Sequence, residues 1–127
     1  MKGLLDTHVF IWWDSEPSKL SPNVTAFLND PKNVVMVSVV SVWELLIKTQ
    51  LGKVGLTLPV KTIVTQQAAN GVHILPVTLD HVLAVESLPP VHKDPFDRLL
   101  AAQAMVEGAT LLTADPIFGK YPVNILW

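Results

Sequence analysis

The stretch Gly3-Leu4-Leu5-Asp6-Thr7-His8 is a short apolar run that stops at an acid. Residues 3–5 predict a buried strand, because such strands are short continuous apolar runs bounded by polar residues. Residues 7–13 predict a helix that starts directly after the acid. A carboxylate between two such elements is flanked by core residues, so we expect Asp6 to be at least partly buried. The fold is therefore expected to begin with a strand, an acid and a helix.

The rest of the chain repeats this alternation of strand and helix. Serine, threonine or aspartate precedes most of the expected helices and glycine follows several of them, as helix capping requires. The expected helices are 22–28 after Ser21, 42–51 begun by Ser38 or Ser41 and closed by Gly52, 59–69, 79–88 after Thr78, and 96–106 between Asp94 and Gly108. The further expected strands are 34–37, 72–77, 110–113 and 123–126. Apolar strands that alternate with helices predict an α/β protein, a three-layer α/β/α fold with a central, mainly parallel sheet.

Composition limits the class of protein. The 127 residues predict one domain, spanning 1–127, that is large enough to bury a core. The absence of cysteine excludes disulfides and thiolate metal sites. The longest apolar stretch, 34–47, is interrupted by polar residues, and the first residues lack the pattern of a secretory signal, so we predict a cytoplasmic protein without a membrane span. The net charge of −2 argues mildly against polynucleotide binding, so any phosphate contact must be local or made through cations.

Acids gather where ligands bind in open parallel sheets, beyond the carboxyl ends of the strands. They are Asp6 and Asp115 at the ends of two expected strands, Asp97 in the first turn of a helix, and Glu44 in the helix after the second strand. Two carboxylates about 4 Å apart repel by roughly 4 kcal/mol at an effective dielectric constant of about 20. Such a cluster therefore persists by holding a proton or by binding a cation. Oxygen ligands favour Mg²⁺ or Mn²⁺ over zinc, and these ions activate water against phosphodiesters.

Glu44 also has a purely structural interpretation. It lies three residues after Ser41 and four before Lys48, so these residues form a polar stripe on an otherwise apolar helix. A glutamate–lysine pair at this spacing stabilises the solvated face of many helices. The spacing alone therefore fits a surface ion pair as well as a metal ligand.

The other acids have local alternatives of the same kind. Asp94 precedes Asp97 by three residues, which resembles a capping box. Asp115-Pro116 fits the start of a turn, where aspartate is common. Asp6 is the acid that these alternatives explain least, because it follows two leucines. The combination of acids, rather than any one of them, points to a metal site.

A pattern of ordered segments extends almost to the end of the chain. The segments are LLDTHVFIWW (4–13), SVWELLIK (41–48) followed by LGK (51–53), HKDPFDRLLAAQA (92–104) and LLTAD (111–115), closed by Tyr121 and Trp127. One such segment would be a weak signal, but their order and spacing together are specific. In this pattern the chain resembles the PIN-domain family, and within it the bacterial toxins called VapC.

The resemblance implies a PIN-like fold and an endoribonuclease that depends on Mg²⁺ or Mn²⁺. The family's catalytic and metal-binding acids map onto the residues already selected by position, Asp6, Glu44, Asp97 and Asp115. The resemblance further places the hydroxyls of Thr7 and Thr113 beside the metal or its water. Asp94 either caps its helix or stands near the site as a further acid. The resemblance also implies an RNA substrate, a cognate VapB-like antitoxin that inhibits the enzyme, and a homodimer.

Basic and aromatic side chains have two interpretations each. The basic residues either contact RNA phosphates or belong to an ordinary solvated face; they are Lys48, Lys53, Lys93, Arg98 and His92. The tryptophans of the expected helices either stack on RNA bases or fill the core, and amphipathic helices favour the core; they are Trp12, Trp13 and Trp43. The histidines show no metal-ligand spacing, and an oxygen-ligand site does not need them.

Other functions fit the sequence less well. A phosphatase of the haloacid-dehalogenase type needs a second acid two residues after Asp6, where the chain has His8. A response-regulator receiver needs an acceptor aspartate at the end of a middle strand, where residues 34–40 offer only Ser38. A PIN domain that binds without catalysis stays open, because it would keep the same residues.

Overall fold

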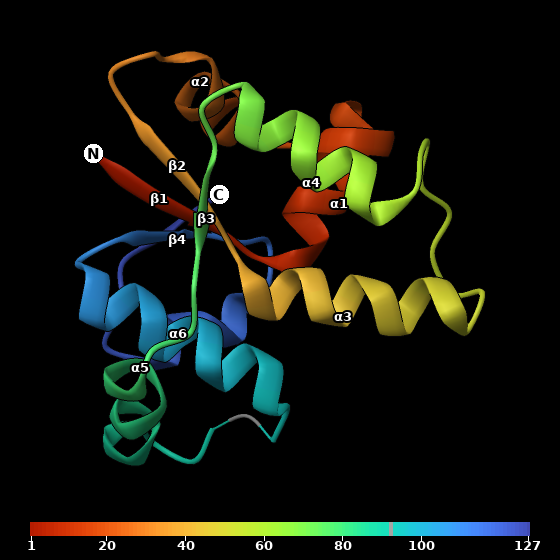
Figure 1. Ribbon diagram of the computed structural model, residues 1–127. Helices are drawn as coiled ribbons and strands as arrows, with labels where there is room; N and C mark the ends of the chain where they lie inside the picture. The colour runs from red at the N-terminus through yellow and green to blue at the C-terminus, as the bar shows by residue number, and fades with distance from the viewer. Residues whose placement is uncertain (92) are drawn as a thin grey trace.

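The computed structural model describes residues 1–91 and 93–127. Within these residues, five parallel strands form one sheet in the order β3-β2-β1-β4-β5 (Figure 1). The strands are β1 Lys2–Leu5, β2 Val34–Ser38, β3 His73–Leu75, β4 Thr110–Leu112 and β5 Ile125–Leu126. The α-helices are α1 Thr7–Ser15, α2 Pro22–Asn29, α3 Val39–Gln50, α4 Val60–Ala69, α5 Leu79–Ala84 and α6 Pro95–Glu107. Short 3₁₀ turns span Pro17–Lys19, Val85–Ser87 and Pro116–Lys120.

Helices cover both faces of the sheet. Successive strand residues point to opposite faces, so Leu5 packs in the core cluster with α1, α2 and α4, whereas Leu4 packs in the cluster with α5 and α6. α3 contributes to both clusters, through Leu45 and Val40 respectively. Figure 1 shows α1, α2 and α4 on one side of the sheet and α5 and α6 on the other. The predicted three-layer α/β/α fold with a parallel sheet is therefore confirmed.

The predicted elements are present with shifted ends. The third and fifth strands are shorter than expected, at 73–75 and 125–126, and the helix expected over 79–88 changes to a 3₁₀ turn after Ala84. Gly52 and Gly108 follow helices as predicted, with positive φ values of 69° and 62° that glycine adopts without steric cost. In the described part of the chain, no helix is long and apolar enough to cross a lipid bilayer.

The start of α3 resolves the choice between the two serines. Ser38 is the cap, and its hydroxyl oxygen accepts a hydrogen bond from the Val40 backbone N–H at 3.0 Å. The helix therefore begins at the end of β2, three residues earlier than expected. Ser41 then lies one turn inside the helix and is fully buried. Its hydroxyl is free to serve a tertiary contact.

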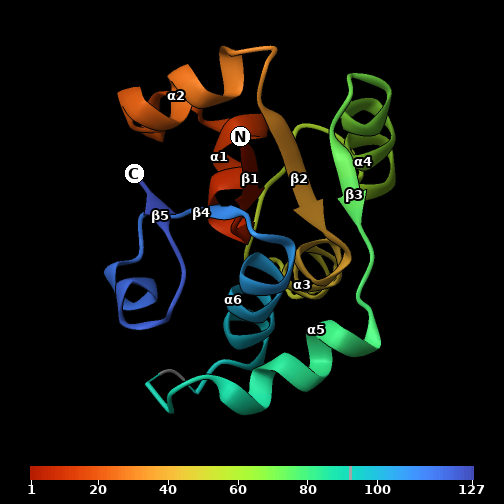
Figure 2. The same ribbon diagram turned by 90° about the vertical axis from the view of Figure 1, so that its left-hand side faces the viewer.

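The carboxyl ends of three strands lie at one edge of the sheet, together with the acids selected from the sequence. Because the strands are parallel, the carboxyl ends of β1, β2 and β4 lie at the same edge. α1 begins there after Asp6, α3 after Ser38, and the loop after β4 carries Asp115. α6 leads back to the start of β4, so its first turn with Asp97 also lies at this edge. α3 and α6 are neighbours in both views (Figures 1 and 2).

Candidate functional site

Asp6 is held at the turn between β1 and α1 with only 5% of its surface exposed. Its Oδ1 accepts a hydrogen bond from the Val9 backbone N–H at 2.8 Å, which caps α1. Its Oδ2 accepts a hydrogen bond from the Thr113 hydroxyl at 2.5 Å. Burial raises the pKa of Asp6 above its usual value; nearby Asp115 adds to the rise, while the Thr113 and Val9 hydrogen bonds oppose it. The expected burial of Asp6 is confirmed, and a second negative charge lies beside it.

Thr113 connects the two strand-end acids. Its hydroxyl donates to Asp6 and accepts a hydrogen bond from the Asp115 backbone N–H at 3.0 Å. The exposed Asp115 side chain accepts from the Ile117 N–H at 3.0 Å and so begins the 3₁₀ turn Pro116–Lys120, as the turn interpretation predicted. Both acids line one hollow of about 370 Å³, together with His8, Trp12, Ala114 and Pro116. The tertiary role of Thr113 was not visible from local sequence.

Thr7 connects α1 to α3. Its hydroxyl donates to the Ser41 hydroxyl oxygen at 3.2 Å, and both side chains are buried. Ser41 lies one helical turn before Glu44, so this bond ties the start of α1 to the part of α3 that carries the acid. The geometry gives Thr7 a positioning contact; its predicted place beside a metal stays a prediction.

Glu44 is buried, with 8% of its surface exposed, although it faces a charged hollow. Its Oε2 lies 3.5 Å from Lys48 Nζ, so the predicted ion pair at i, i+4 is present. The burial does not fit a solvated surface stripe, since the side chain of Glu44 is only 11% exposed and that of Lys48 only 25%. Glu44 lines a hollow of about 510 Å³, distinct from that of Asp6, whose other lining residues are Ile47, Lys48, Leu51, Lys53, Lys93, Asp94, Pro95 and Phe96.

Asp94 caps α6. Its Oδ1 accepts hydrogen bonds from the backbone N–H groups of Phe96 at 2.8 Å and Asp97 at 3.4 Å. The capping prediction is thus confirmed, and Asp94 also faces the hollow of Glu44. Asp97 is half-buried in the first turn of α6.

The donor chemistry of this edge fits a hard divalent cation, but the acids are not gathered into one cage. No three His, Asp or Glu side chains in residues 1–91 and 93–127 lie close enough to share an ion. Asp6 and Asp115 offer carboxylate oxygens whose mutual repulsion a cation would relieve. Glu44 would have to exchange Lys48 for the cation to join them. The strand-end pair is therefore the part of the predicted quartet that already fits.

The tryptophans divide. Trp12 and Trp13 pack against the core as predicted, but the prediction for Trp43 is wrong, because 59% of its surface is exposed. α3 buries positions 40, 41, 44 and 45, so the helical period turns position 43 away from the protein. The Trp43 ring instead packs edge to face with Phe96 of α6, with ring centroids 5.0 Å apart.

The basic residues are engaged to different degrees. The Arg98 guanidinium donates to the carbonyls of Pro89 at 3.0 Å and Val85 at 3.3 Å, so it ties down the segment before α6. Lys53 and Lys93 are exposed and form no ion pair with any residue that the structure describes. His92 lies outside the described residues. Contact of these residues with phosphate stays a prediction.

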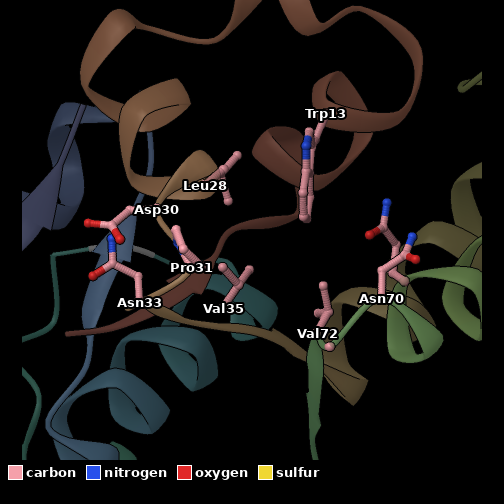
Figure 3. Close-up of a pocket in the computed structure, with 10 residues that line it drawn as sticks. Trp13, Leu28, Asp30, Pro31, Asn33, Val35, Asn70 and Val72 are labelled. Atoms are coloured by element: carbon pink, nitrogen blue, oxygen red, sulfur yellow. The ribbon is translucent and has the colours of Figure 1, made fainter.

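A further hollow lies at the opposite end of the sheet from the acids. It has a volume of about 530 Å³, and Figure 3 shows Trp13, Asn70 and Asp30 on different sides of it. Asp30 is its only lining acid among the described residues. The size of a hollow therefore does not locate the acidic site in this molecule.

Comparisons with known proteins agree with the fold and identify the family. The PIN domain family model matches residues 3–124. Ribonuclease VapC22 of Mycobacterium tuberculosis is 32% identical over 113 residues, covering 88% of this chain and 85% of the relative. A crystal structure of VapBC2 from Rickettsia felis bound to a promoter DNA fragment superposes with a TM-score of 0.74 at 16% identity, over 100% of this chain and 99% of that one. A toxin–antitoxin complex from Klebsiella pneumoniae gives a TM-score of 0.64 at 17% identity, over 98% and 96% of the chains.

Proposed function

This chain belongs to the PIN-domain family and is VapC-like, and on that premise we propose that it is a metal-dependent endoribonuclease. The observation that carries the proposal is the buried Asp6 carboxylate, held by Thr113 and placed beside Asp115. Burial and a neighbouring negative charge both destabilise an ionised carboxylate. Carboxylates in such an environment are therefore concentrated at functional sites. The proposed enzyme would hydrolyse RNA phosphodiester bonds with Mg²⁺ or Mn²⁺ held by these acids.

The residues divide the chemistry between them. Asp6 and Asp115 would hold the cation, with Glu44 and Asp97 approaching from α3 and α6. When bound, Mg²⁺ or Mn²⁺ supplies activation of a water for attack on the phosphodiester. The hydrogen bonds from Val9 and Thr113 keep the Asp6 carboxylate in one orientation, which preorganises the ligand. Lys48 neutralises Glu44 in the free protein.

A free ribonuclease of this kind needs a partner that silences it. We propose a cognate VapB-like antitoxin, in keeping with the toxin–antitoxin complexes that share the fold. An arginine or lysine of the antitoxin would pair with the strand-end carboxylates in place of the metal. The proposal also includes one domain over 1–127, a homodimer and a cytoplasmic location, where RNA and the antitoxin are both present.

The experiment is cleavage of RNA by the purified protein with Mg²⁺, with Mn²⁺ and with excess EDTA. We expect products with 5′-phosphate and 3′-hydroxyl ends, formed only with metal, and no cleavage by Asp6→Asn. Asp80→Asn is the matched control, because Asp80 is an exposed acid of α5 outside the site. Cyclic 2′,3′-phosphate ends or full activity in EDTA would overturn the mechanism. A folded, metal-binding protein that cleaves no RNA would instead be a binding-only PIN domain.

A further inference from the structure

An aromatic pair with one exposed ring lies at the edge of the molecule that carries the candidate site. Trp43 of α3 and Phe96 of α6 meet at 5.0 Å between ring centroids, with their planes at 74°. Trp43 leaves 59% of its surface exposed, whereas Phe96 is half-buried and packs against the core. The Phe96 contact restricts rotation of the Trp43 ring. A large ring is thus held in a fixed orientation with much of its surface open.

The pair directly adjoins two acids of the proposed site. Trp43 precedes Glu44 in α3, and Phe96 precedes Asp97 in α6. The ring contact therefore bridges the two helices at the turns that carry those acids. The aromatic pair therefore lies at the outer rim of the helix turns that carry Glu44 and Asp97.

The adjoining hollow has the opposite charge to the whole chain. Phe96 and Glu44 line it with Lys48, Lys53 and Lys93. Its three lysines outnumber its two carboxylates, Glu44 and Asp94, which gives a local charge of +1, against −2 for the chain. Lys53 and Lys93 have no ion-pair partner among the residues described, so their charge is available to an anion.

We propose that Trp43, supported by Phe96, is a base-stacking platform for the RNA substrate, with Lys53 and Lys93 contacting the backbone phosphates. Binding of single strands combines a stacked aromatic ring with a local positive groove, because every base offers a flat face and every linkage a negative charge. A duplex offers the charge without the accessible base faces. The inference rests on the proposed function, since it assigns substrate-binding residues to the same site.

The test measures binding without cleavage. A 12-nucleotide oligoadenylate is titrated in EDTA, with tryptophan fluorescence and anisotropy of an end label as readouts. We expect Trp43→Leu to weaken binding by about 5- to 150-fold, the value of one stacked base, and Trp43→Phe to restore part of the loss. Leu46→Ala is the matched control, because Leu46 is exposed on the same helix but does not line the hollow.

The lysines have their own readout. Lys53→Gln with Lys93→Gln should lower the slope of log Kd against log salt by about 0.7 for each lost contact with a single strand. A 12-base-pair RNA duplex should bind weakly to every variant and show no dependence on Trp43.

Specific results would overturn the inference. If Trp43→Leu binds the oligonucleotide with the same affinity as the unmodified protein, Trp43 is not a stacking platform. Trp43→Leu that alters self-association in sedimentation, with RNA binding unchanged, assigns Trp43 to an interface between copies. Trp43-dependent binding by a protein that fails to cleave RNA with metal leaves the inference standing and removes only the proposed function. If Trp43→Leu cleaves RNA with an unchanged KM, the proposed function stands and the role of Trp43 in binding is excluded.

Discussion

The strand-end half of the site, formed by Asp6, Thr113 and Asp115, differs from the helix half, formed by Glu44, Lys48 and Lys93. In the strand-end half, backbone N–H groups and a buried hydroxyl hold the carboxylates. In the helix half, a long lysine faces Glu44 at 3.5 Å and exposed lysines surround it. Hydrogen bonds from the backbone fix a group in place, whereas long charged side chains rearrange at little cost. Under the proposed function, the strand-end half would therefore fix the position of the chemistry, and the helix half would adjust to the bound substrate or metal.

The largest expected effect is that of Asp6→Asn on activity. Asparagine can still accept the Val9 hydrogen bond but lacks the charge that a cation needs. We expect metal-dependent RNA cleavage to fall by about 10³-fold or more, as for loss of a central catalytic group. Initial rates with a labelled RNA and Mn²⁺ measure this, with circular dichroism to confirm the fold. Activity within tenfold of the unmodified protein would move the site away from the strand-end half.

Glu44→Gln tests whether the helix half takes part in the chemistry. A surface partner of Lys48 is worth only about 0.2–0.5 kcal/mol, so a structural role predicts a nearly unchanged enzyme. We expect instead a loss of cleavage of about 10²-fold or more, with unfolding temperature unchanged or raised. Lys48→Gln is the matched control, because it breaks the same ion pair and keeps the acid. If Glu44→Gln cleaves RNA as well as Lys48→Gln does, the role of Glu44 is structural.

Thr113→Val breaks the strand-end half without changing its charge. The valine removes the donor to Asp6 and the acceptor for the Asp115 N–H, so we expect a stability loss of about 1–3 kcal/mol from the unpaired groups. Cleavage should fall about 10–100-fold, as for loss of a residue that orients a metal ligand. Thr113→Ser keeps the hydroxyl and should restore most of both. Urea unfolding and cleavage rates are measured for both variants. If Thr113→Ser is as impaired as Thr113→Val, loss of the hydroxyl is not the cause.

The raised pKa of Asp6 predicts a pH dependence of stability. Its usual value is 3.8, and burial raises the pKa in the folded protein, so the folded state holds the proton more tightly. Stability therefore falls as pH rises through the window that begins at 3.8, and the full loss is present above the folded-state pKa. Asp6→Asn has no carboxylate to ionise at this position. Without metal, its unfolding temperature should therefore exceed that of the unmodified protein at pH 7, and the difference should shrink towards pH 3. An advantage that grows on acidification would contradict this assignment.

The smallest effect is expected for Asp94→Asn. Asparagine caps helices about as well as aspartate, so the hydrogen bonds to Phe96 and Asp97 should persist and stability should change by less than about 0.5 kcal/mol. Asp97→Asn provides the comparison, because it should keep the fold and lose cleavage. If both variants lose cleavage at unchanged unfolding temperature, Asp94 belongs to the helix half as a working acid.

Sequence predicted the edge of the site better than its interior. The proximity of Asp6 and Asp115, which line one hollow, could be predicted because apolar runs end near them and parallel strands bring such ends together. The Thr113 bond to Asp6 joins positions 107 apart in the chain, and no local pattern encodes such a contact. The exposure of Trp43 was missed because its position depends on where α3 begins, and two serines competed for that start. For Arg98, the sequence left a phosphate contact and a solvated face open. It did not indicate the hydrogen bonds that the guanidinium donates to the carbonyls of Pro89 and Val85.

The central place of β1 in the sheet determines when, during synthesis of the chain, Asp6 can meet Thr113. β1 is made first, yet its second neighbour, β4, begins at residue 110. With the 107 positions that separate Asp6 from Thr113, ribosomes adding about 5–20 residues per second need about 5–20 s to deliver the second half of the contact. During that interval the nascent chain holds one acid without its hydroxyl donor or its neighbouring carboxylate. Under the proposed function, the strand-end half of the site assembles only after Thr113 and Asp115 have been added, and an antitoxin made beforehand would have those seconds to be in place.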